Sequence, residues 1–201
     1  MPKSLSKSLR KGVCLLSIAA FFHACGEHDE PADPFDEVAI KKDFKERPLN
    51  VIHDEFEGAS WTPPVPGLIT EAQILSFVQM NRLAMRIVEV SSRDFDEKVE
   101  KASHDEDRYS RAATEFSAAG NVRNAATAQI RASLRLGLNP REMDWLGLEI
   151  SRAARILAER RVDEKQGQIP QQRTPAEKAN TELVARHAKE LAPYIRALRT
   201  R

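Results

Sequence analysis

The chain has 201 residues, with 31 Lys and Arg against 30 Asp and Glu, so its formal charge is +1. That length suits one ordinary domain with an appendage, and the balanced charge gives no case for binding nucleic acid, which usually needs a basic excess. The two cysteines are too few for a disulfide scaffold. Few aromatic residues and only eight glycines, with abundant Ala, Leu, Arg and Glu, favour helices over a β-sandwich or β-barrel.

Residues 1–24 have the composition of a secretory signal peptide. The first twelve residues carry four bases and no acid, and an apolar run follows from Val13 to Ala24. About twelve apolar residues are too few for the roughly 20 that span a bilayer. We therefore expect this segment to direct export and then to be cleaved.

The residue after the apolar run is Cys25. Phe22, His23, Ala24 and Cys25 resemble the lipobox of a bacterial lipoprotein precursor, with His23 at a place where a small residue is usual. The resemblance implies that Cys25 becomes the new amino terminus and carries diacylglyceryl and acyl lipid, such as palmitate, that anchors the chain to the bilayer. It implies no other cofactor. The alternative is an ordinary secretory signal that is cut nearby.

The residues around the lipobox also bear on sorting and on thiol chemistry. Gly26 and Glu27 follow the cysteine, and neither is the Asp that marks inner-membrane retention in enteric-type sorting. In a diderm bacterium the resemblance thus implies the periplasmic face of the outer membrane rather than the inner membrane. With Cys14 in the leader and Cys25 acylated, the mature chain has no thiol for a disulfide, for catalysis or for a metal.

Residues 25–69 are predicted to form a lipidated, largely irregular acidic tether that contains several prolines. Between residues 26 and 57 eleven acids stand against four bases, which is typical of a solvated linker. A flexible tether of this length averages about 35–40 Å from end to end, enough to lift a domain off the membrane. Asp33 and Pro34 could open a short helix that carries Phe35, Val38 and Phe44. That helix packs back on the body, stays disordered, or folds on contact with a partner.

Residues 70–201 are predicted to form an all-α domain, a small bundle of about five helices. Helix boundaries are expected at the capping box that starts with Thr70, at the Gly120–Asn121 turn, at Gly137, and at the starts marked by Asn139 and Thr174. The charged stretch 92–107 either continues the first helix or breaks near residue 104, and Pro193 kinks or ends the last helix. The expected buried faces recur at helical spacing. They comprise Ile74, Phe77, Val78, Leu83, Ala84, Ile87 and Val88 on the first helix and Met143, Leu146, Ile150, Ala153 and Leu157 on the fourth.

One segment resembles a single tetratricopeptide hairpin. Tyr109, Ala112, Ala113 and Phe116 fill the aromatic and small places of its first helix, and Gly120–Asn121 fills its turn. The resemblance implies an adaptor that contacts a partner through Tyr109 and Phe116. Since such units need about three copies in a row and only one is found, a generic helical hairpin is the alternative.

Three His-Asp-Glu tripeptides begin at His28, His53 and His104. Imidazole beside carboxylate suits Zn²⁺ or another divalent metal. Two of the three fall in the tether, and none shows the i, i+4 histidine pairing of a helical zinc site. We therefore expect no metal site, with these histidines as the candidates if one exists.

The two ends of the mature chain differ in charge. Residues 121–201 carry sixteen bases against nine acids, and Arg131 and Arg135 lie one helical turn apart. This basic face could meet lipid head groups or an acidic partner, dock the acidic tether within the chain, or form a solvated surface.

The sequence contains no nucleophile elbow, glycine-rich phosphate loop or HExxH motif, and His187 is expected at the edge of the core. We therefore predict that the chain is not an enzyme. The function that the sequence favours is a lipid-anchored, exported helical module that binds another envelope protein or stabilises an envelope assembly. The alternatives are a lipoprotein that binds a divalent metal or a small ligand, and a tetratricopeptide-like adaptor.

Overall fold

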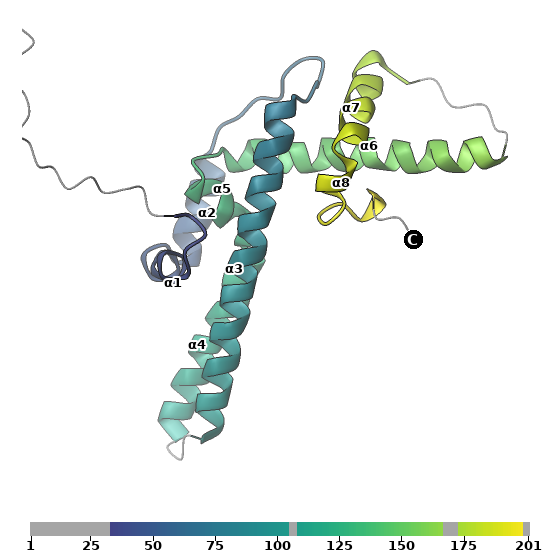
Figure 1. Cartoon of the computed structure of the whole chain (residues 1–201). Coiled ribbons are helices and arrows are strands. Elements are labelled where there is room, and N and C mark those ends of the chain that lie inside the picture. Colours follow the sequence, from purple (N-terminus) through teal and green to yellow (C-terminus); the bar gives the residue numbers. More distant parts are fainter. Residues whose placement is uncertain (1–32, 105–107, 167–172, 199–201) are drawn as a thin grey trace, which may run out of the picture. The chain divides into compact units, whose positions relative to one another are not determined.

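The computed structural model describes residues 33–104, 108–166 and 173–198. Within these ranges every regular element is helical, so the predicted all-α class is confirmed (Figure 1). The elements are α1 (Glu37–Glu46), α2 (Leu49–Gly58), α3 (Glu71–His104), α4 (Arg108–Ala126), α5 (Ala128–Arg135), α6 (Pro140–Gln166), α7 (Pro175–Arg186), α8 (Ala188–Leu191) and a 3₁₀ turn, η1 (Arg196–Leu198).

The hydrophobic core is built mainly from α3 and α6, with α5, α7 and α8 packed around them. Ile74, Leu83 and Ile87 of α3 and Leu146 and Ile150 of α6 are wholly buried. Their three- and four-residue spacing places them on one face of each helix, as predicted. Each buried Ile or Leu stabilises the fold by about 1.5–3 kcal/mol relative to an exposed one.

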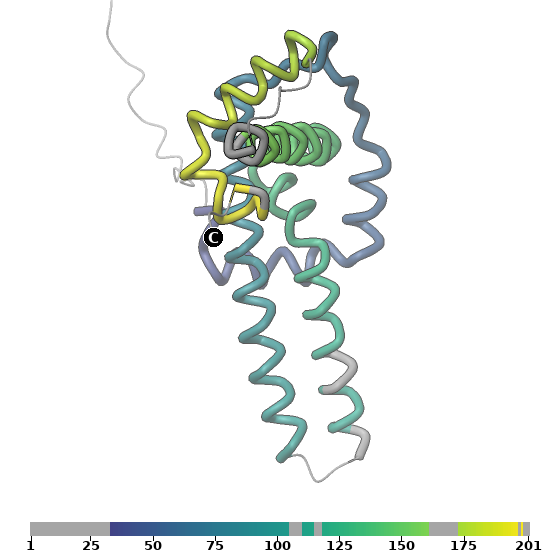
Figure 2. The backbone as a smooth tube through the Cα atoms, turned by 90° about the vertical axis from the view of Figure 1, so that its right-hand side faces the viewer, coloured from purple at the N-terminus to yellow at the C-terminus, as the bar shows by residue number. Residues whose placement is uncertain are grey.

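A long helical hairpin of α3 and α4 extends beyond the other helices (Figures 1 and 2). The 34 residues of α3 make it about 51 Å long at 1.5 Å per residue. The charged stretch after residue 92 is helical as far as His104, where α3 ends, so the alternative of a break near residue 104 fits the described residues. An ion pair between Lys98 and Asp94, at 2.7 Å, supports this part of α3.

Three predicted helix starts are confirmed by their capping bonds. The Thr70 amide donates to Gln73 Oε1 at 3.0 Å, and the Gln73 amide donates to the Thr70 hydroxyl at 3.3 Å. Asn139 Oδ1 accepts from the Arg141 amide at 2.9 Å, and Thr174 forms a full capping box at the start of α7. These bonds satisfy backbone amides that have no partner within the first turn of a helix.

The predicted stop at Gly137 is also confirmed. Gly137 has a φ of 65°, a left-handed conformation that glycine adopts without the penalty of a Cβ atom. The Leu138 amide donates to the Ser133 carbonyl at 2.9 Å, and the Gly137 amide donates to the Leu134 carbonyl at 3.2 Å. This pair of bonds is a Schellman motif, which closes the end of α5.

The predicted turn at Gly120–Asn121 is wrong, because α4 runs through both residues to Ala126. Asn121 is 3% exposed, and its side-chain amide donates to Asp94 Oδ2 of α3 at 3.0 Å. Glycine inside a helix costs only about 0.5–1 kcal/mol relative to alanine, and packing against α3 offsets it. The tetratricopeptide-like hairpin is therefore corrected as well, since its turn lies inside one continuous helix.

The acidic segment before residue 60 differs from the irregular tether that the sequence predicted. Residues 33–58 form α1 and α2, and Ile40 and Ile52 are wholly buried. Of the alternatives for the helix after Asp33, packing back on the body is therefore confirmed. Its N-cap is Asp36, whose carboxylate accepts from the Ala39 amide at 2.8 Å.

The connection from α2 to α3 is fixed to the start of α6. The rings of Trp61 and Trp145 lie 4.9 Å apart between centroids, and Asn139 donates its side-chain amide to the Ser60 carbonyl at 3.0 Å. Arg141 donates to the Phe56 carbonyl at 3.1 Å. The connection therefore belongs to the folded body.

At the other end of the chain, the helical region breaks twice. α7 ends at Arg186, and the short α8 ends at Leu191, two residues before Pro193, which agrees with the predicted stop. Residues 70–198 thus form six α-helices in their described parts, where about five were expected. The additional helix comes from the break at His187, while the break at Thr127 replaces the one expected at Gly120; neither His187 nor Thr127 is a glycine or proline that would signal a break.

Candidate functional site

Arg131 of α5 is buried, with 1% of its surface exposed. It makes four hydrogen bonds, to Asp43 Oδ2 at 2.9 Å, the Arg47 carbonyl at 2.9 Å, Asn124 Oδ1 at 3.0 Å and Thr127 Oγ1 at 3.1 Å. Burial lowers the pKa of the Arg131 guanidinium below its ordinary value, and the hydrogen bond to Asp43 opposes that effect. Because arginine stays protonated in proteins, the pair remains ionic. Arg131 therefore holds α1 onto α5 rather than facing a partner.

Arg135, one turn further along α5, does the same for the start of α1. Its guanidinium donates to the Ala39 carbonyl at 3.0 Å and to the Pro34 carbonyl at 3.1 Å. From α3, Arg93 Nη2 lies 2.7 Å from Glu37 Oε2. The sequence left three roles for the basic residues: binding head groups or an acidic partner, binding the acidic segment of the same chain, or forming a solvated surface. Arg131 and Arg135 bind the acidic segment.

A shallow groove between α3 and α4, here called the α3–α4 groove, is lined by Met85, Val88 and Phe95 of α3 and by Val122 and Ala125 of α4. Two adjoining hollows of about 380 and 250 Å³ form it and share Ala125. Met85 and Val122 are each 59% exposed, although both are large apolar side chains. Such side chains gathered on one surface are typical of a site that another molecule covers.

The floor of the α3–α4 groove is made of small residues. They are Ala84 and Ser91 of α3, which are buried, and Ala125 of α4, which is half-buried. Small side chains let the backbone of an incoming helix approach closely, which ridges-into-grooves packing requires. The Ser91 hydroxyl is buried and has no hydrogen-bond partner among the described residues. The groove therefore has the shape and chemistry of a seat for an amphipathic helix.

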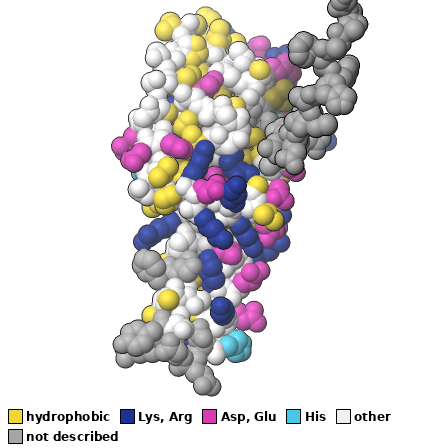
Figure 3. All heavy atoms as spheres, turned by 90° about the vertical axis from the view of Figure 1, so that its left-hand side faces the viewer, with side chains coloured by type: hydrophobic (Ala, Val, Ile, Leu, Met, Phe, Trp, Pro, Cys, Tyr) yellow, Lys and Arg dark blue, Asp and Glu magenta, His cyan; other side chains and the backbone are white. Residues whose placement is uncertain are grey.

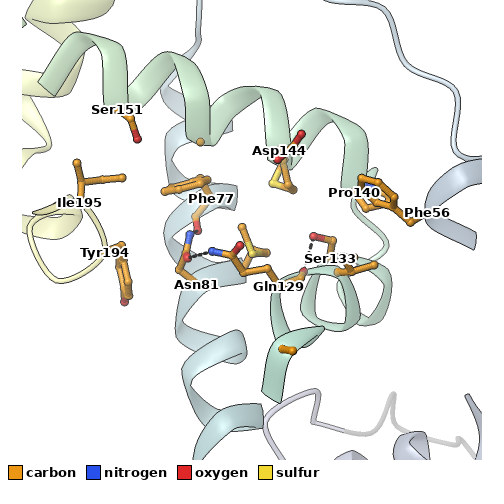
Figure 4. A pocket seen from close by; sticks show the side chains of 15 residues that line it. Phe56, Phe77, Asn81, Gln129, Ser133, Pro140, Asp144, Ser151, Tyr194 and Ile195 are labelled. Atoms are coloured by element: carbon orange, nitrogen blue, oxygen red, sulfur yellow. Dashed lines mark hydrogen bonds between the residues drawn. The ribbon is translucent and has the colours of Figure 1, made fainter. Parts of the chain in front are cut away.

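A second hollow, here called the polar cleft, has a volume of about 390 Å³ and lies between α3, α5, α6 and the segment after α8 (Figure 4). Its polar side chains are those of Asn81, Gln129, Ser133, Asp144, Ser151 and Tyr194, with Phe77, Ile195 and Phe56 as apolar walls. The volume falls in the range of about 300–1,000 Å³ that small-molecule sites occupy.

The chemistry of the polar cleft is that of hydrogen bonding. Gln129 donates its side-chain amide to Asn81 Oδ1 at 3.1 Å, and Asn81 donates to the Phe77 carbonyl at 2.8 Å, so the two amides are held in place (Figure 4). Asp144 is exposed and is the one carboxylate among the described residues that line the cleft. This arrangement suits a small polar ligand that both donates and accepts hydrogen bonds.

The histidines proposed as metal ligands fall on separate elements. His53 lies on α2 and His104 ends α3, while His28 is outside the described residues. Within the described ranges no group of three or more His, Cys, Asp and Glu side chains is placed to hold a metal ion. His187 lies beside the core with its Nε2 3.4 Å from Glu71 Oε1.

The remaining sequence-predicted sites lie outside what the structure describes. Cys25 belongs to the segment before residue 33. The backbone of α4 carries Tyr109 and Phe116, but their side chains are not among those described. Their proposed contact with a partner stays a prediction.

Both hollows were missed in the sequence. Val88 was expected in the buried face of the first helix but is 39% exposed. Met85, three residues before Val88, and Phe95, seven residues after it, are apolar as well. Together with the buried residues they make the apolar side of α3 wider than the face that packs against the core. Asn81, a polar residue four positions after the buried Phe77, was the one local signal for the polar cleft.

Comparison of the chain with protein-family models, with curated proteins and with solved structures finds no match. None of the described helices combines the length and the apolar character that a crossing of the bilayer requires.

Proposed function

We propose that the chain is an exported bacterial lipoprotein, anchored through an acylated Cys25, whose helical body binds an amphipathic helix of another envelope protein in the α3–α4 groove. The observation that carries the binding part is the exposed apolar stripe of Met85, Val88 and Val122 over a floor of small residues. The lipobox-like residues before Cys25 carry the anchoring part.

The chain itself supplies a precedent for a helix that packs against this hairpin. α1 packs against α3 through Ile40, and its acids pair with bases of α3, as in the contact of Glu37 with Arg93. The α3–α4 groove lies between α3 and α4. No helix among the described segments packs over it in the way that α1 packs over α3. A partner helix with apolar residues at i, i+3 and i+7 fits this surface in the way that known helix-in-groove complexes do.

The folded body begins close to the proposed anchor. Seven residues lie between Cys25 and Asp33, where the described structure starts, and the eight residue steps reach at most about 29 Å at 3.3–3.6 Å per step. A tether of about 44 residues would have allowed a larger and more variable distance. The partner we propose is therefore a protein of the same membrane or one that lies directly against it.

Lipidation is tested by growing cells with radiolabelled palmitate. We expect label on the natural chain, no label on Cys25→Ser, and loss of the mature form from the membrane fraction of that variant. Cys14→Ser is the matched control, because it alters the other cysteine of the chain. An unlabelled natural chain, or equal fractionation of the two variants, contradicts the proposed anchor.

Partner binding is tested with a photoreactive phenylalanine analogue at position 122 in the native envelope. The same analogue at position 148 is the control, because Leu148 is 64% exposed but lies on α6, outside the groove. We expect a discrete adduct only from position 122, its loss in Met85→Glu, and a joined peptide that belongs to an amphipathic helix of an envelope protein. An adduct of two copies of this chain, or equal yields from both positions, contradicts the proposal.

A second candidate function is the binding of a small polar ligand in the polar cleft, favoured by the fixed amides of Asn81 and Gln129. Ser151 lines the cleft and is exposed, so Ser151→Trp should fill it without disturbing the core. We expect small molecules that co-purify with the natural chain, read by mass spectrometry, to be absent from this variant. Position-122 adducts should be unchanged, which separates the two functions.

A further inference from the structure

A third hollow, here called the basic cleft, lies between α1, α3 and α4 and has a volume of about 580 Å³. Its cations are Lys41 and Lys45 of α1, Lys98 of α3 and Arg123 of α4. Asp94 is the one acid among the described residues that line it. Figure 3 views the molecule from the side of α1 and shows Lys and Arg side chains gathered across the middle of that face, with acids among them.

The cations of the basic cleft exceed what the fold uses. Asp94 is already bound by Lys98 at 2.7 Å and by the Asn121 amide at 3.0 Å, with Lys41 at 3.9 Å. Lys45 and Arg123 are exposed, and neither forms an ion pair with a described residue. Two full positive charges therefore face the cleft with nothing opposite them in the described structure.

One wall of the basic cleft is apolar. Phe44, Pro48 and Leu49 line it beside the two free cations. A small inorganic anion would use the charges but not this wall. A ligand that joins a phosphate to an apolar stem uses both, because the phosphate accepts hydrogen bonds from ammonium and guanidinium groups while the stem contacts the apolar side chains.

In the sequence, the basic cleft begins shortly after the proposed lipid anchor. α1 is the first described helix after Cys25, and Lys41 and Lys45 lie about one and two turns from its start. The eight residue steps from Cys25 to Asp33 keep Asp33, four residues before the start of α1, within about 29 Å of the acylated residue. The cleft therefore lies within reach of the head groups around the anchor.

We propose that the basic cleft binds an anionic phospholipid, with the phosphate of its head group at Lys45 and Arg123 and the first carbons of its acyl chains against Phe44 and Leu49. The proposal rests on the proposed lipid anchor for its source of ligand. A head group bound there would fix the orientation of the body on the membrane. The α3–α4 groove would stay free for a partner.

The test uses the full-length gene product, purified from a bacterial envelope in a detergent with an uncharged head group. Native mass spectrometry then counts the molecules bound after addition of phosphatidylglycerol, phosphatidylcholine or inorganic phosphate. We expect phosphatidylglycerol to bind at least tenfold more tightly than phosphatidylcholine, whose choline cancels the phosphate charge. Rising salt should weaken the binding, since both free cations are exposed.

The decisive variant is Lys45→Gln with Arg123→Gln. Each cation near an anionic head group accounts for about a fivefold increase in affinity. The double variant should therefore bind phosphatidylglycerol about 25-fold more weakly than the natural chain. The control is Arg155→Gln with Lys178→Gln, two exposed residues on α6 and α7 that do not line the cleft. Helical content and the melting temperature of both variants should match the natural chain, because all four side chains are exposed.

Four results would overturn the proposal. Three of them are equal binding of the two lipids, an equal loss of affinity in the control variant, and inorganic phosphate that binds as tightly as phosphatidylglycerol. The fourth is lipid binding that appears only in a triple variant of the acids after Cys25, Glu27→Gln with Asp29→Asn and Glu30→Gln. The last would mean that the acidic residues after Cys25 occupy the cleft. The same spectra report the acyl mass on Cys25, so failure of the anchor and failure of the cleft are read separately.

Discussion

At the scale of single residues, the buried pair of Arg131 and Asp43 joins two parts of the chain that lie 88 residues apart. Arg131 is 1% and Asp43 8% exposed, so water screens neither charge well. Removing one member of a buried pair leaves an uncompensated charge, which costs about 3–5 kcal/mol. The pair is therefore one of the main contacts that hold α1 on the body, beside Ile40 and the bonds from Arg135.

We expect Arg131→Met to lower the free energy of unfolding by about 3–5 kcal/mol, because the buried Asp43 then keeps only the distant Arg47, whose Nε lies 3.7 Å from its carboxylate. Arg131→Met with Asp43→Leu should recover most of that loss, because both charges are gone. Denaturant titrations followed by circular dichroism measure both, with the exposed Arg155→Met expected within about 0.5 kcal/mol of the natural chain. A single variant that loses less than about 1 kcal/mol would show that the pair does not hold α1.

Asp94 gives a prediction for the pH dependence of stability. Burial raises the pKa of Asp94, but hydrogen bonds from Lys98 and Asn121 outweigh burial and leave the pKa below its ordinary value of 3.8. Its carboxylate therefore stabilises the fold above that ordinary value, and the stabilisation is lost as the pH falls through the lower pKa of the folded state. The stability difference between the natural chain and Asp94→Asn should shrink between pH 6 and pH 3. A difference that stays constant over this range would contradict the assignment.

At the scale of helices, the starts at Thr70, Asn139 and Thr174 could be predicted because each capping bond joins residues two or three positions apart. The end of α4 could not, because Gly120 carries a local stop signal that packing of Asn121 against α3 overrides. The same limit applies to α1, whose acidic composition indicated a linker while Ile40 faced a core formed by distant residues. Local signals thus predicted helix starts better than they predicted which helices pack together.

Two glycines test this difference between local signal and packing. Gly120 lies inside α4, and a Cβ there meets no atom within 4 Å, so Gly120→Ala should raise the free energy of unfolding by about 0.5–1 kcal/mol. Gly137→Ala should lower it by about 1–2 kcal/mol, because its φ of 65° disfavours any Cβ although space is equally open. Thermal unfolding of the two variants measures both effects. If Gly120→Ala destabilised the chain, the continuous α4 would be wrong.

At the scale of the whole molecule, all three hollows depend on contacts that no single segment of sequence records. The α3–α4 groove depends on how the residues of α3 and α4 are aligned against each other. The polar cleft joins Asn81 to Gln129, which lie 48 residues apart in the sequence. The basic cleft needs α1 to lie on α3 and α4. The charge difference between the two ends of the chain did predict that acidic and basic parts could meet, but not that Arg131 would be buried by the contact.

The short connection before α1 leads to a prediction about the intact lipoprotein. Inserting about 30 Gly and Ser residues between Pro31 and Ala32 lengthens the connection from Cys25 to Asp33 from 8 to about 38 residue steps. The effective concentration of head groups at the basic cleft should fall about tenfold, since it scales with the −3/2 power of linker length. Cross-linking to photoactivatable phosphatidylglycerol in reconstituted vesicles measures this, with affinity in detergent unchanged. An unchanged yield in vesicles would mean that proximity to the anchor plays no part.

The contact of Trp61 with Trp145 makes the fold unusually easy to observe by optical spectroscopy. The chain contains two tryptophans, and both belong to this one contact, with their ring planes inclined by 48°. Indole emission and an exciton signal in circular dichroism therefore report a single event, the release of the α2–α3 connection from α6. A melting curve followed at the indole band and one followed at the helix band would show whether the α2–α3 connection leaves α6 together with the loss of helix or before it.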